Sequence, residues 1–177
     1  MMNQNKNVPQ TANSIVSPRI LTIGVYGYIE ETFFQALREA GVDTFCDIRR
    51  RRGVRGARYA FANSKRLQAR LAELGIQYHH FLELAPTAEI RERQKTADKT
   101  ARVAKRERTG LDDAFIEAYT EEILASFDAD AFLQKLGDQP RVIALCCVEK
   151  EPAACHRSLV TAKLQQELGL EVEHMVP

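Results

Sequence analysis

The sequence predicts a single α/β domain, a three-layer sandwich in which helices cover both faces of a mainly parallel, five-stranded sheet. Two observations lead to this fold class. Short apolar runs alternate along the chain with longer stretches of helical periodicity, an arrangement typical of parallel sheets with helical crossovers. The length of 177 residues is that of one domain.

The first half of the chain contains three strand signals and two helix signals. The apolar run 20–24 predicts a strand, and 30–40 predicts a helix because its apolar residues recur at helical spacing. Gly41 ends this helix and leads to a second strand, 42–48. A helix starting at Asn63 or Ser64 and ending at Gly75 precedes the third strand, 76–81.

The second half changes character before the pattern resumes. Residues 85–110 form a basic helical segment with few apolar anchors, which we expect to be a mobile lid or arm. Residues 111–136 are amphipathic and acidic and predict a pair of helices that covers the sheet. The apolar run 142–147 predicts the fourth strand, 158–168 a helix, and 171–176 the last strand.

The composition of the chain limits the classes of protein to which it can belong. Residues 1–18 are polar and predict a flexible tail ahead of the domain, 19–177. The four cysteines lack the spacing of a secreted disulfide framework, and no signal peptide or membrane-spanning run is recognisable. We therefore expect a soluble cytoplasmic protein with reduced thiols. A net charge of +1 indicates that any contact with a polyanion is local.

Polar side chains follow the strands at their carboxyl ends, where open parallel sheets bind ligands. Tyr26 follows the first strand, Asp47 and Arg49 end the second, and His80 lies in the third. We expect a site at this edge of the sheet.

The segment 146–158 is the predicted active-site loop, because it joins a buried strand to a helix and carries thiol, imidazole and guanidinium groups. Cys155 is the candidate nucleophile, since the helix dipole and the neighbouring His156 and Arg157 favour its thiolate. The alternative is that Cys155 only closes the loop on the sheet. Cys147 is the second candidate, and Cys146 beside it must point to the opposite face.

Other groups of this edge have expected roles in proton transfer. His156 or His80 would exchange protons, while Asp47 or Glu149 would orient a histidine or act as a base.

The arginines of the same loops are candidates for anion binding. Arg49 and Arg157 would neutralise a phosphate or carboxylate, with Ser158 as a helix cap or a further donor. The alternative is that Arg157 pairs with Asp47 or Glu149 and ties the loops together.

A metal site is chemically conceivable here because thiolate and imidazole suit zinc. Seven residues separate Cys147 from Cys155, however, whereas zinc knuckles have about two to four. The sequence therefore favours no metal and no cofactor.

A second candidate surface is the arginine-rich loop 49–58. Guanidinium groups such as Arg52 and Arg55 bind phosphates, and Tyr59 or Phe61 could stack on bases. With the basic segment 91–108 this loop would form a cationic edge. The alternative is that these arginines pair with the acidic helices of 112–130.

Several short motifs, in this order, resemble the domain-of-unknown-function family 488. They are Thr22-Ile23-Gly24, Asp47-Ile48-Arg49, Gly75-Ile76-x-Tyr78 leading to Glu83-Leu84, and Cys147-x-Glu149-x-x-Pro152-x-x-Cys155-His156-Arg157-Ser158. The resemblance covers about residues 20–177 and implies a single α/β domain without an established activity.

The chain departs from the pattern of many members at several positions. Val25-Tyr26 follow Gly24 in place of His-Ser, the stretch 51–56 is arginine-rich where Pro and Ser are usual, and Ala85-Pro86 replace Gly-Gly. The chain looks like an Arg-rich branch of the family.

Together these features predict a Cys-dependent hydrolase or transferase that acts on a phosphate-containing substrate, a nucleotide or nucleic acid, at the carboxyl edge of the sheet. The alternative is a non-catalytic nucleic-acid-binding module that uses the loop 49–58 and the segment 91–108. A weaker third hypothesis is a redox-responsive regulator that joins Cys147 to Cys155. No membrane partner is expected, and the oligomeric state stays open.

Overall fold

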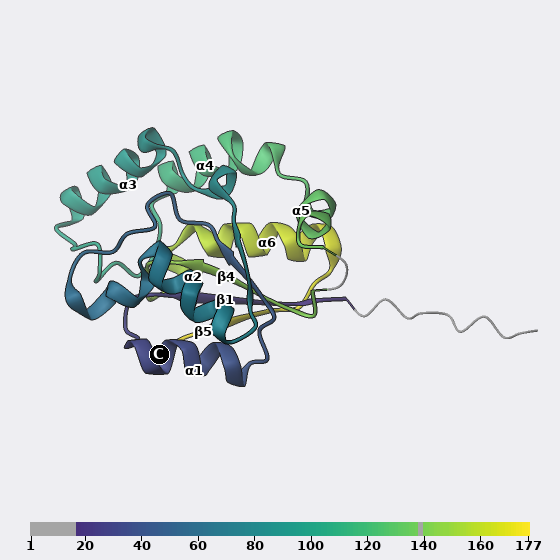
Figure 1. Cartoon of the computed structure of the whole chain (residues 1–177). Helices are drawn as coiled ribbons and strands as arrows, with labels where there is room; N and C mark the ends of the chain where they lie inside the picture. Colours follow the sequence, from purple (N-terminus) through teal and green to yellow (C-terminus); the bar gives the residue numbers. More distant parts are fainter. Residues whose placement is uncertain (1–16, 138–139) are drawn as a thin grey trace, which may run out of the picture.

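A five-stranded sheet forms the middle of the structure, a computed structural model that describes residues 17–137 and 140–177 (Figure 1). In the described residues all strand pairings are parallel, and the order is β3-β2-β4-β1-β5. Each predicted strand is present, with bounds shifted by up to two residues: β1 (Arg19–Gly24), β2 (Thr44–Asp47), β3 (Gln77–His80), β4 (Val142–Cys147) and β5 (Val172–Met175). Residues 1–16 of the predicted tail lie outside the described part of the chain.

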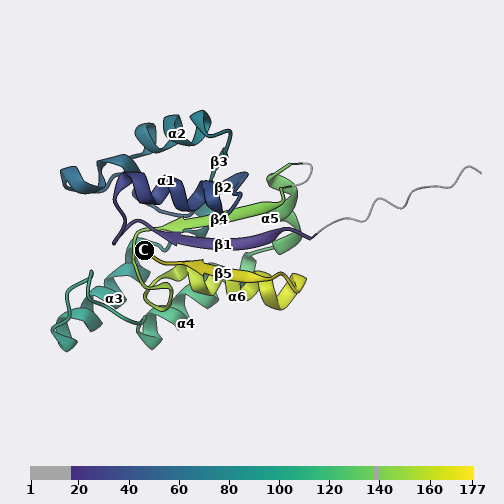
Figure 2. The same ribbon diagram turned by 90° about the horizontal axis from the view of Figure 1, so that it is seen from below.

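Helices cover both faces of this sheet, which confirms the three-layer prediction (Figure 2). One face carries α1 (Glu30–Glu39) and α2 (Ser64–Glu73). The other carries α3 (Ala88–Ala101), α4 (Asp113–Glu122), α5 (Ala129–Lys135) and α6 (His156–Leu168). None of the helices in the described ranges is long and apolar enough to cross a membrane.

The sheet separates two apolar cores. Phe33 of α1 and Leu67 of α2 pack with Cys146 of β4 on one face. Tyr119 of α4 packs with Cys147 of β4 on the other. The predicted opposite orientation of the two adjacent cysteines is confirmed, as the alternation of side chains along a strand requires.

The basic segment 85–110 consists of α3 and the turns that follow it. The side chain of Thr87 caps α3 by accepting a hydrogen bond from the Ile90 amide. Ile90 and Gln94 are buried, and the Gln94 side-chain oxygen accepts a 2.9 Å hydrogen bond from the Asp112 amide at the start of α4. The segment is thus docked on α4, and its movement as a lid stays a prediction.

The last helix begins two residues earlier than predicted, at His156 instead of Ser158. A short 3-10 turn, η4 (Pro152–Ala154), leads directly into it, so that extended Cys155 occupies the N-cap position. Ser158 lies within the first turn, where its hydroxyl donates to the Cys155 carbonyl oxygen at 2.9 Å. Cys155 and His156 are thereby held at the start of the helix.

Candidate functional site

The loops at the carboxyl ends of β1, β2 and β4, together with α3 and its following turns, surround a cavity of about 590 Å³. This is the edge that appears on the left in Figure 1. The predicted gathering of distant segments at one edge of the sheet is therefore present: the Ile48 carbonyl after β2 accepts a hydrogen bond from His156 of α6.

The wall of the cavity is strongly basic. It contains two carboxylates, Asp98 and Glu149, against nine arginine and lysine side chains. These nine come from the loop after β2, from α3 and from the turns after α3: Arg49, Arg50, Arg51, Arg55, Arg91, Lys95, Lys105, Arg106 and Arg108. Such an excess of positive charge in a concave site attracts anions.

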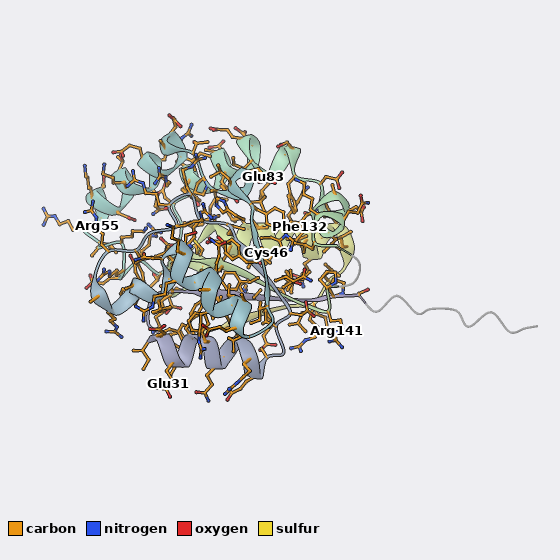
Figure 3. The ribbon with its side chains drawn as sticks, viewed as in Figure 1. Glu31, Cys46, Arg55, Glu83, Phe132 and Arg141 are labelled. Carbon is orange, nitrogen blue, oxygen red and sulfur yellow. The ribbon has the colours of Figure 1, made fainter. Side chains whose placement is uncertain are left out.

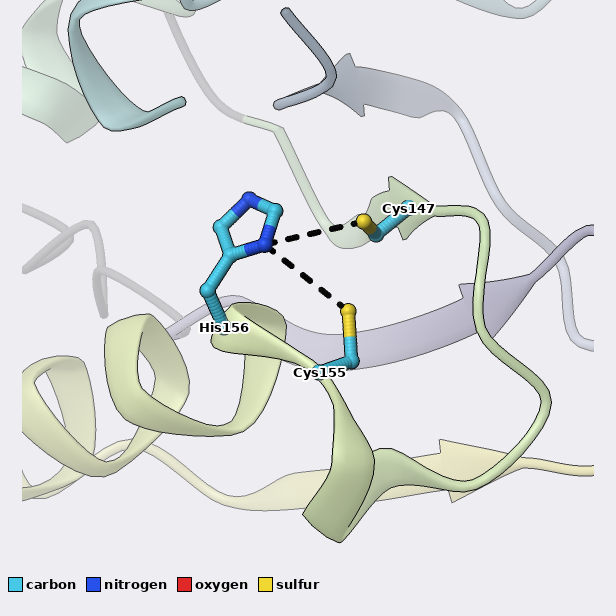
Figure 4. A group of neighbouring side chains, drawn as sticks. All are labelled: Cys147, Cys155 and His156. Carbon is cyan, nitrogen blue, oxygen red and sulfur yellow. Dashed lines mark hydrogen bonds between the residues drawn. The ribbon is translucent and has the colours of Figure 1, made fainter. Parts of the chain in front are cut away.

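Two thiols and one imidazole meet at the floor of the cavity (Figure 4). The Nδ1 atom of His156 lies 3.7 Å from Sγ of Cys147 and 3.9 Å from Sγ of Cys155. Cys147 ends β4, whereas Cys155 and His156 begin α6. All three side chains are buried beneath the basic wall.

The backbone fixes the orientation of the imidazole. Nε2 of His156 lies 3.1 Å from the carbonyl oxygen of Ile48, and a carbonyl only accepts hydrogen bonds, so Nε2 carries a proton. The Tyr119 ring, with its centroid 5.5 Å from that of the imidazole, packs beside it. Nδ1 is therefore the nitrogen that faces both sulfurs.

The two thiols differ in acidity although both are buried. Burial raises the pKa of the Cys147 thiol, and the adjacent Cys155 raises it further. Burial also opposes ionisation of Cys155, but hydrogen bonds from Cys147 and His156 hold the pKa of Cys155 well below its usual value. The N-terminal end of α6 acts in the same direction, because the helix dipole stabilises a thiolate.

The pKa of His156 is raised. Burial alone would lower the pKa of this imidazole, but its hydrogen bond to the Cys155 thiolate outweighs burial. Without a further ligand, the favoured charge state is therefore a thiolate beside an imidazolium.

Glu149 is a buried carboxylate next to this cluster. Its Oε2 atom lies 3.4 Å from Cys147 Sγ, and its Oε1 atom lies 3.1 Å from Nζ of Lys105 and 3.5 Å from Nη2 of Arg108. Burial alone would raise the pKa of Glu149, but the Lys105 ammonium overrides burial and lowers it to about 2. Glu149 is ionised at neutral pH.

A family model described as domain of unknown function DUF488 matches residues 29–164. The chain belongs to this family. No curated protein and no solved structure matches it. The long motif 147–158 lies inside the matched range, whereas β1 precedes it and β5 follows it.

In this DUF488 chain Asp47 and Arg49 form a buried ion pair. The Arg49 guanidinium donates to the carboxylate at 2.8 and 2.7 Å, and the Tyr78 hydroxyl donates to the same carboxylate at 2.9 Å. Burial would lower the pKa of Arg49, but the hydrogen bond to Asp47 raises it. A further bond at 3.0 Å from Arg49 to the Ala62 carbonyl holds the arginine-rich loop against the sheet.

Arg157 is fully buried and bonds to backbone and hydroxyl oxygens. Its Nη2 donates to the Lys150 carbonyl at 2.7 Å, its Nη1 donates to the Glu149 carbonyl, and its Nε donates to the Thr22 hydroxyl at 3.3 Å. The side chain thus ties the loop after β4 to β1.

Seven of the predicted site residues line the cavity: Tyr26, Arg49, Arg55, Cys147, Glu149, Cys155 and His156. Five others do not: Asp47, Arg52, His80, Arg157 and Ser158. His80 lies 3.0 Å from the Arg49 carbonyl through its Nε2 atom, and Arg52 lies 3.5 Å from the Tyr78 hydroxyl.

The DUF488 motifs do not include the cations that complete the wall. Arg108 donates to Asp98 at 2.9 Å and to the Ala154 carbonyl at 2.9 Å, and its buried Nε has no partner among the described residues. The Arg106 guanidinium stacks on Tyr26, 4.9 Å from the ring centroid. In the sequence these residues are ordinary members of a charged helical stretch, so no local signal separates them from exposed cations.

Proposed function

We propose that the protein is an enzyme that binds a phosphate-bearing substrate, a nucleotide or nucleic acid, in the basic cavity and transforms it at the Cys147, Cys155 and His156 floor. One observation carries the proposal: a single cavity combines an excess of arginines and lysines with two thiols and an imidazole. Positive charge would hold the phosphate while the floor supplies the reactive groups. The reaction class is Cys-dependent hydrolysis or group transfer.

Two features of the wall support phosphate binding. Arg51 and Arg55 are exposed at the cavity rim and can fork to phosphate oxygens. The Nε–H of Arg108 is a buried donor with no acceptor among the described residues. An anion that reached this donor would supply the missing acceptor.

An aromatic ring in the cavity wall, that of Tyr26, supports a nucleotide as the phosphate carrier, and the buried Tyr59 packs behind it. The centroids of Tyr26 and Tyr59 lie 5.1 Å apart, and the guanidinium of Arg106 lies over both rings. Bases stack on such aromatic and guanidinium faces without requiring a particular sequence.

Glu149 supports a role of the floor in catalysis. Its carboxylate lies beside Cys147 inside the cavity, in a position to accept a proton from a reacting group. In this proposal Arg49 and Arg157 act as positioning residues, since both hold cavity loops in place through internal hydrogen bonds.

The proposal is tested with Cys155→Ser and the matched control Cys46→Ser, which alters another buried thiol on β2. Binding of nucleotides and short oligonucleotides is measured by calorimetry, and turnover by chromatography of the products. We expect Cys155→Ser to abolish turnover with affinity unchanged, and Cys46→Ser to retain both. A wild-type protein that binds no nucleotide or oligonucleotide contradicts the proposal.

One observation favours a second candidate function, a non-catalytic nucleic-acid-binding module. Arg51, Arg55 and Arg58 are exposed on the loop after β2, and Figure 3 shows Arg55 projecting outward from the molecule. Under this function Cys155→Ser has no effect, whereas alanine at the loop arginines weakens a salt-dependent affinity.

A further inference from the structure

We propose that Cys147, Cys155 and His156 bind one thiophilic divalent cation, for which Zn²⁺ is the best match, and leave a fourth coordination position open to the basic cavity. The proposal that these residues bind a metal depends only on the arrangement of their ligand atoms. A catalytic use of the metal rests on the proposed function.

The three donor atoms are already close enough to share one ion. Sγ of Cys147, Sγ of Cys155 and a ring nitrogen of His156 all lie within 4.8 Å of one another. The two distances from Nδ1 to sulfur are 3.7 and 3.9 Å. A tetrahedral zinc site, with bonds of about 2.3 Å to sulfur and 2.0 Å to nitrogen, separates its ligand atoms by roughly 3.5–3.8 Å.

The imidazole is oriented as metal-bound histidines are. Its Nε2–H donates to the Ile48 carbonyl, which directs Nδ1 toward both sulfurs, so that Nδ1 can bind a metal once it has lost its proton. In metal sites the second ring nitrogen almost always donates to a carbonyl, a carboxylate or water, and this contact fixes the ring. The backbone after β2 thus supplies the outer contact.

The fold brings Cys147 and Cys155 together, although their separation in the sequence argued against a metal site. The loop 148–154 turns back through η4, so that Cys155 at the start of α6 lies beside Cys147 at the end of β4. Arg157 holds this loop through the carbonyl oxygens of Glu149 and Lys150. The donors are therefore pre-organised by a strand end and a helix start.

The cluster has three ligands and faces the cavity. No fourth Cys, His, Asp or Glu belongs to it within residues 17–137 and 140–177. Three protein ligands plus an exchangeable position are the pattern of catalytic zinc, whereas structural zinc has four. In this proposal the open position holds water, and the Glu149 carboxylate, whose Oε2 atom lies 3.4 Å from Cys147 Sγ, takes a proton from that water.

Metal binding and hydrolysis at this site need no reactant other than water and the substrate. On metal binding the Cys147 thiol and Nδ1 of the His156 imidazolium release their protons to solvent, and Cys155 binds as the thiolate. In a hydrolysis the oxygen of the bound water forms the new bond to the substrate, its proton passes to Glu149, and the leaving group departs with that proton.

The test uses the full-length reduced protein after removal of metals by a chelator. Zn²⁺ is titrated in competition with a chromogenic chelator, and Co²⁺ is added as a spectroscopic probe of thiolate ligands. We expect one equivalent of Zn²⁺ per chain and a thiolate-to-cobalt charge-transfer absorption band. Because the Co²⁺ spectrum is recorded on the wild-type protein, it does not depend on the folding of any variant.

Variants then assign the ligands. Cys147→Ala, Cys155→Ala and His156→Ala are each expected to weaken Zn²⁺ binding by at least ~100-fold, since loss of an outer contact alone costs about 10–100-fold. Cys46→Ala, which removes a buried thiol elsewhere, should bind as tightly as wild type. Absence of stoichiometric Zn²⁺, absence of the charge-transfer band, or unchanged binding in the three ligand variants would overturn the proposal.

The same preparations separate this proposal from the proposed function. Stoichiometric Zn²⁺ in a protein that binds no nucleotide leaves the metal site standing and removes the function. Turnover of a nucleotide that persists in metal-free protein leaves the function standing and removes the catalytic metal.

Discussion

Arg49, two residues after β2, and Arg157, in the first turn of α6, are almost completely inaccessible, with 2% and 0% exposure. Both were predicted to neutralise an anion. Burial of a guanidinium is costly unless each donor finds an acceptor, and both side chains use theirs on Asp47, on Thr22 and on backbone carbonyls. Their internal hydrogen bonds position the loops, so the proposed function assigns anion binding to the more exposed cations of the wall.

We expect Arg157→Met to destabilise the protein by at least about 1.5–3 kcal/mol, the contribution of one hydrogen bond to a charged group, because several carbonyl acceptors lose their donor. Urea denaturation measures the free energy of unfolding. The matched control is Arg38→Met on the exposed side of α1, for which a change within about 0.5 kcal/mol is expected. Equal stability of the two variants would contradict the role given to Arg157.

At the level of the strands and loops, the end of β1 approaches the backbone of the loop after β4 very closely at Gly24. A side chain at Gly24 would bring its Cβ to 1.9 Å from the Glu149 carbonyl oxygen, which is the acceptor of Arg157. Only glycine leaves room for this contact. The backbone of the loop can therefore lie on the end of β1 and carry Glu149 into the cavity.

Gly24→Ala should consequently displace the loop 148–151 and destabilise the fold by about 1–3 kcal/mol, the usual cost of overpacking. Because the loop carries Glu149, ligand binding in the cavity should weaken as well. Thermal unfolding and nucleotide titration measure the two effects. Gly110→Ala is the control, since an added Cβ there meets nothing within 4 Å; a Gly24→Ala protein as stable as this control would refute the argument.

Across the molecule, like charges face one another over the cavity from two segments far apart in sequence. Burial lowers the pKa of Arg91 on α3, and repulsion from Arg51 and Arg50 of the loop after β2 lowers it further. An entering anion relieves this repulsion. The nearly neutral chain thus concentrates positive charge at one edge, as a local polyanion site requires.

Charge reversal on either segment should therefore weaken nucleotide binding. Arg51→Glu and Arg91→Glu are each expected to raise the dissociation constant roughly fivefold, which corresponds to ~1 kcal/mol for an exposed charge contact. The effect should shrink at high salt. Calorimetric titration at two salt concentrations measures it, with Arg38→Glu on α1 as the control. Similar affinities for all three variants would show that the cavity is not the binding site.

Much of the architecture could be predicted from local patterns. The alternation of apolar runs and helical periodicity predicted every strand, and Gly41 and Gly75 marked helix ends at which the chain takes left-handed conformations. The motif 147–158 located the floor of the cavity. These features act over a few residues, so they are readable without knowledge of the rest of the chain.

The partners of the charged groups could not be read in this way. Whether an arginine binds an anion or a neighbouring carbonyl depends on which segments meet in space, as in the contacts of Arg108 with Glu149 and of Arg157 with Thr22. The long spacing of Cys147 and Cys155 argued against a metal, yet the turn through η4 brings both sulfurs to His156. Hydrophobic periodicity orders the elements along the chain, whereas burial and pairing across the fold determine which of its polar groups remain free to act.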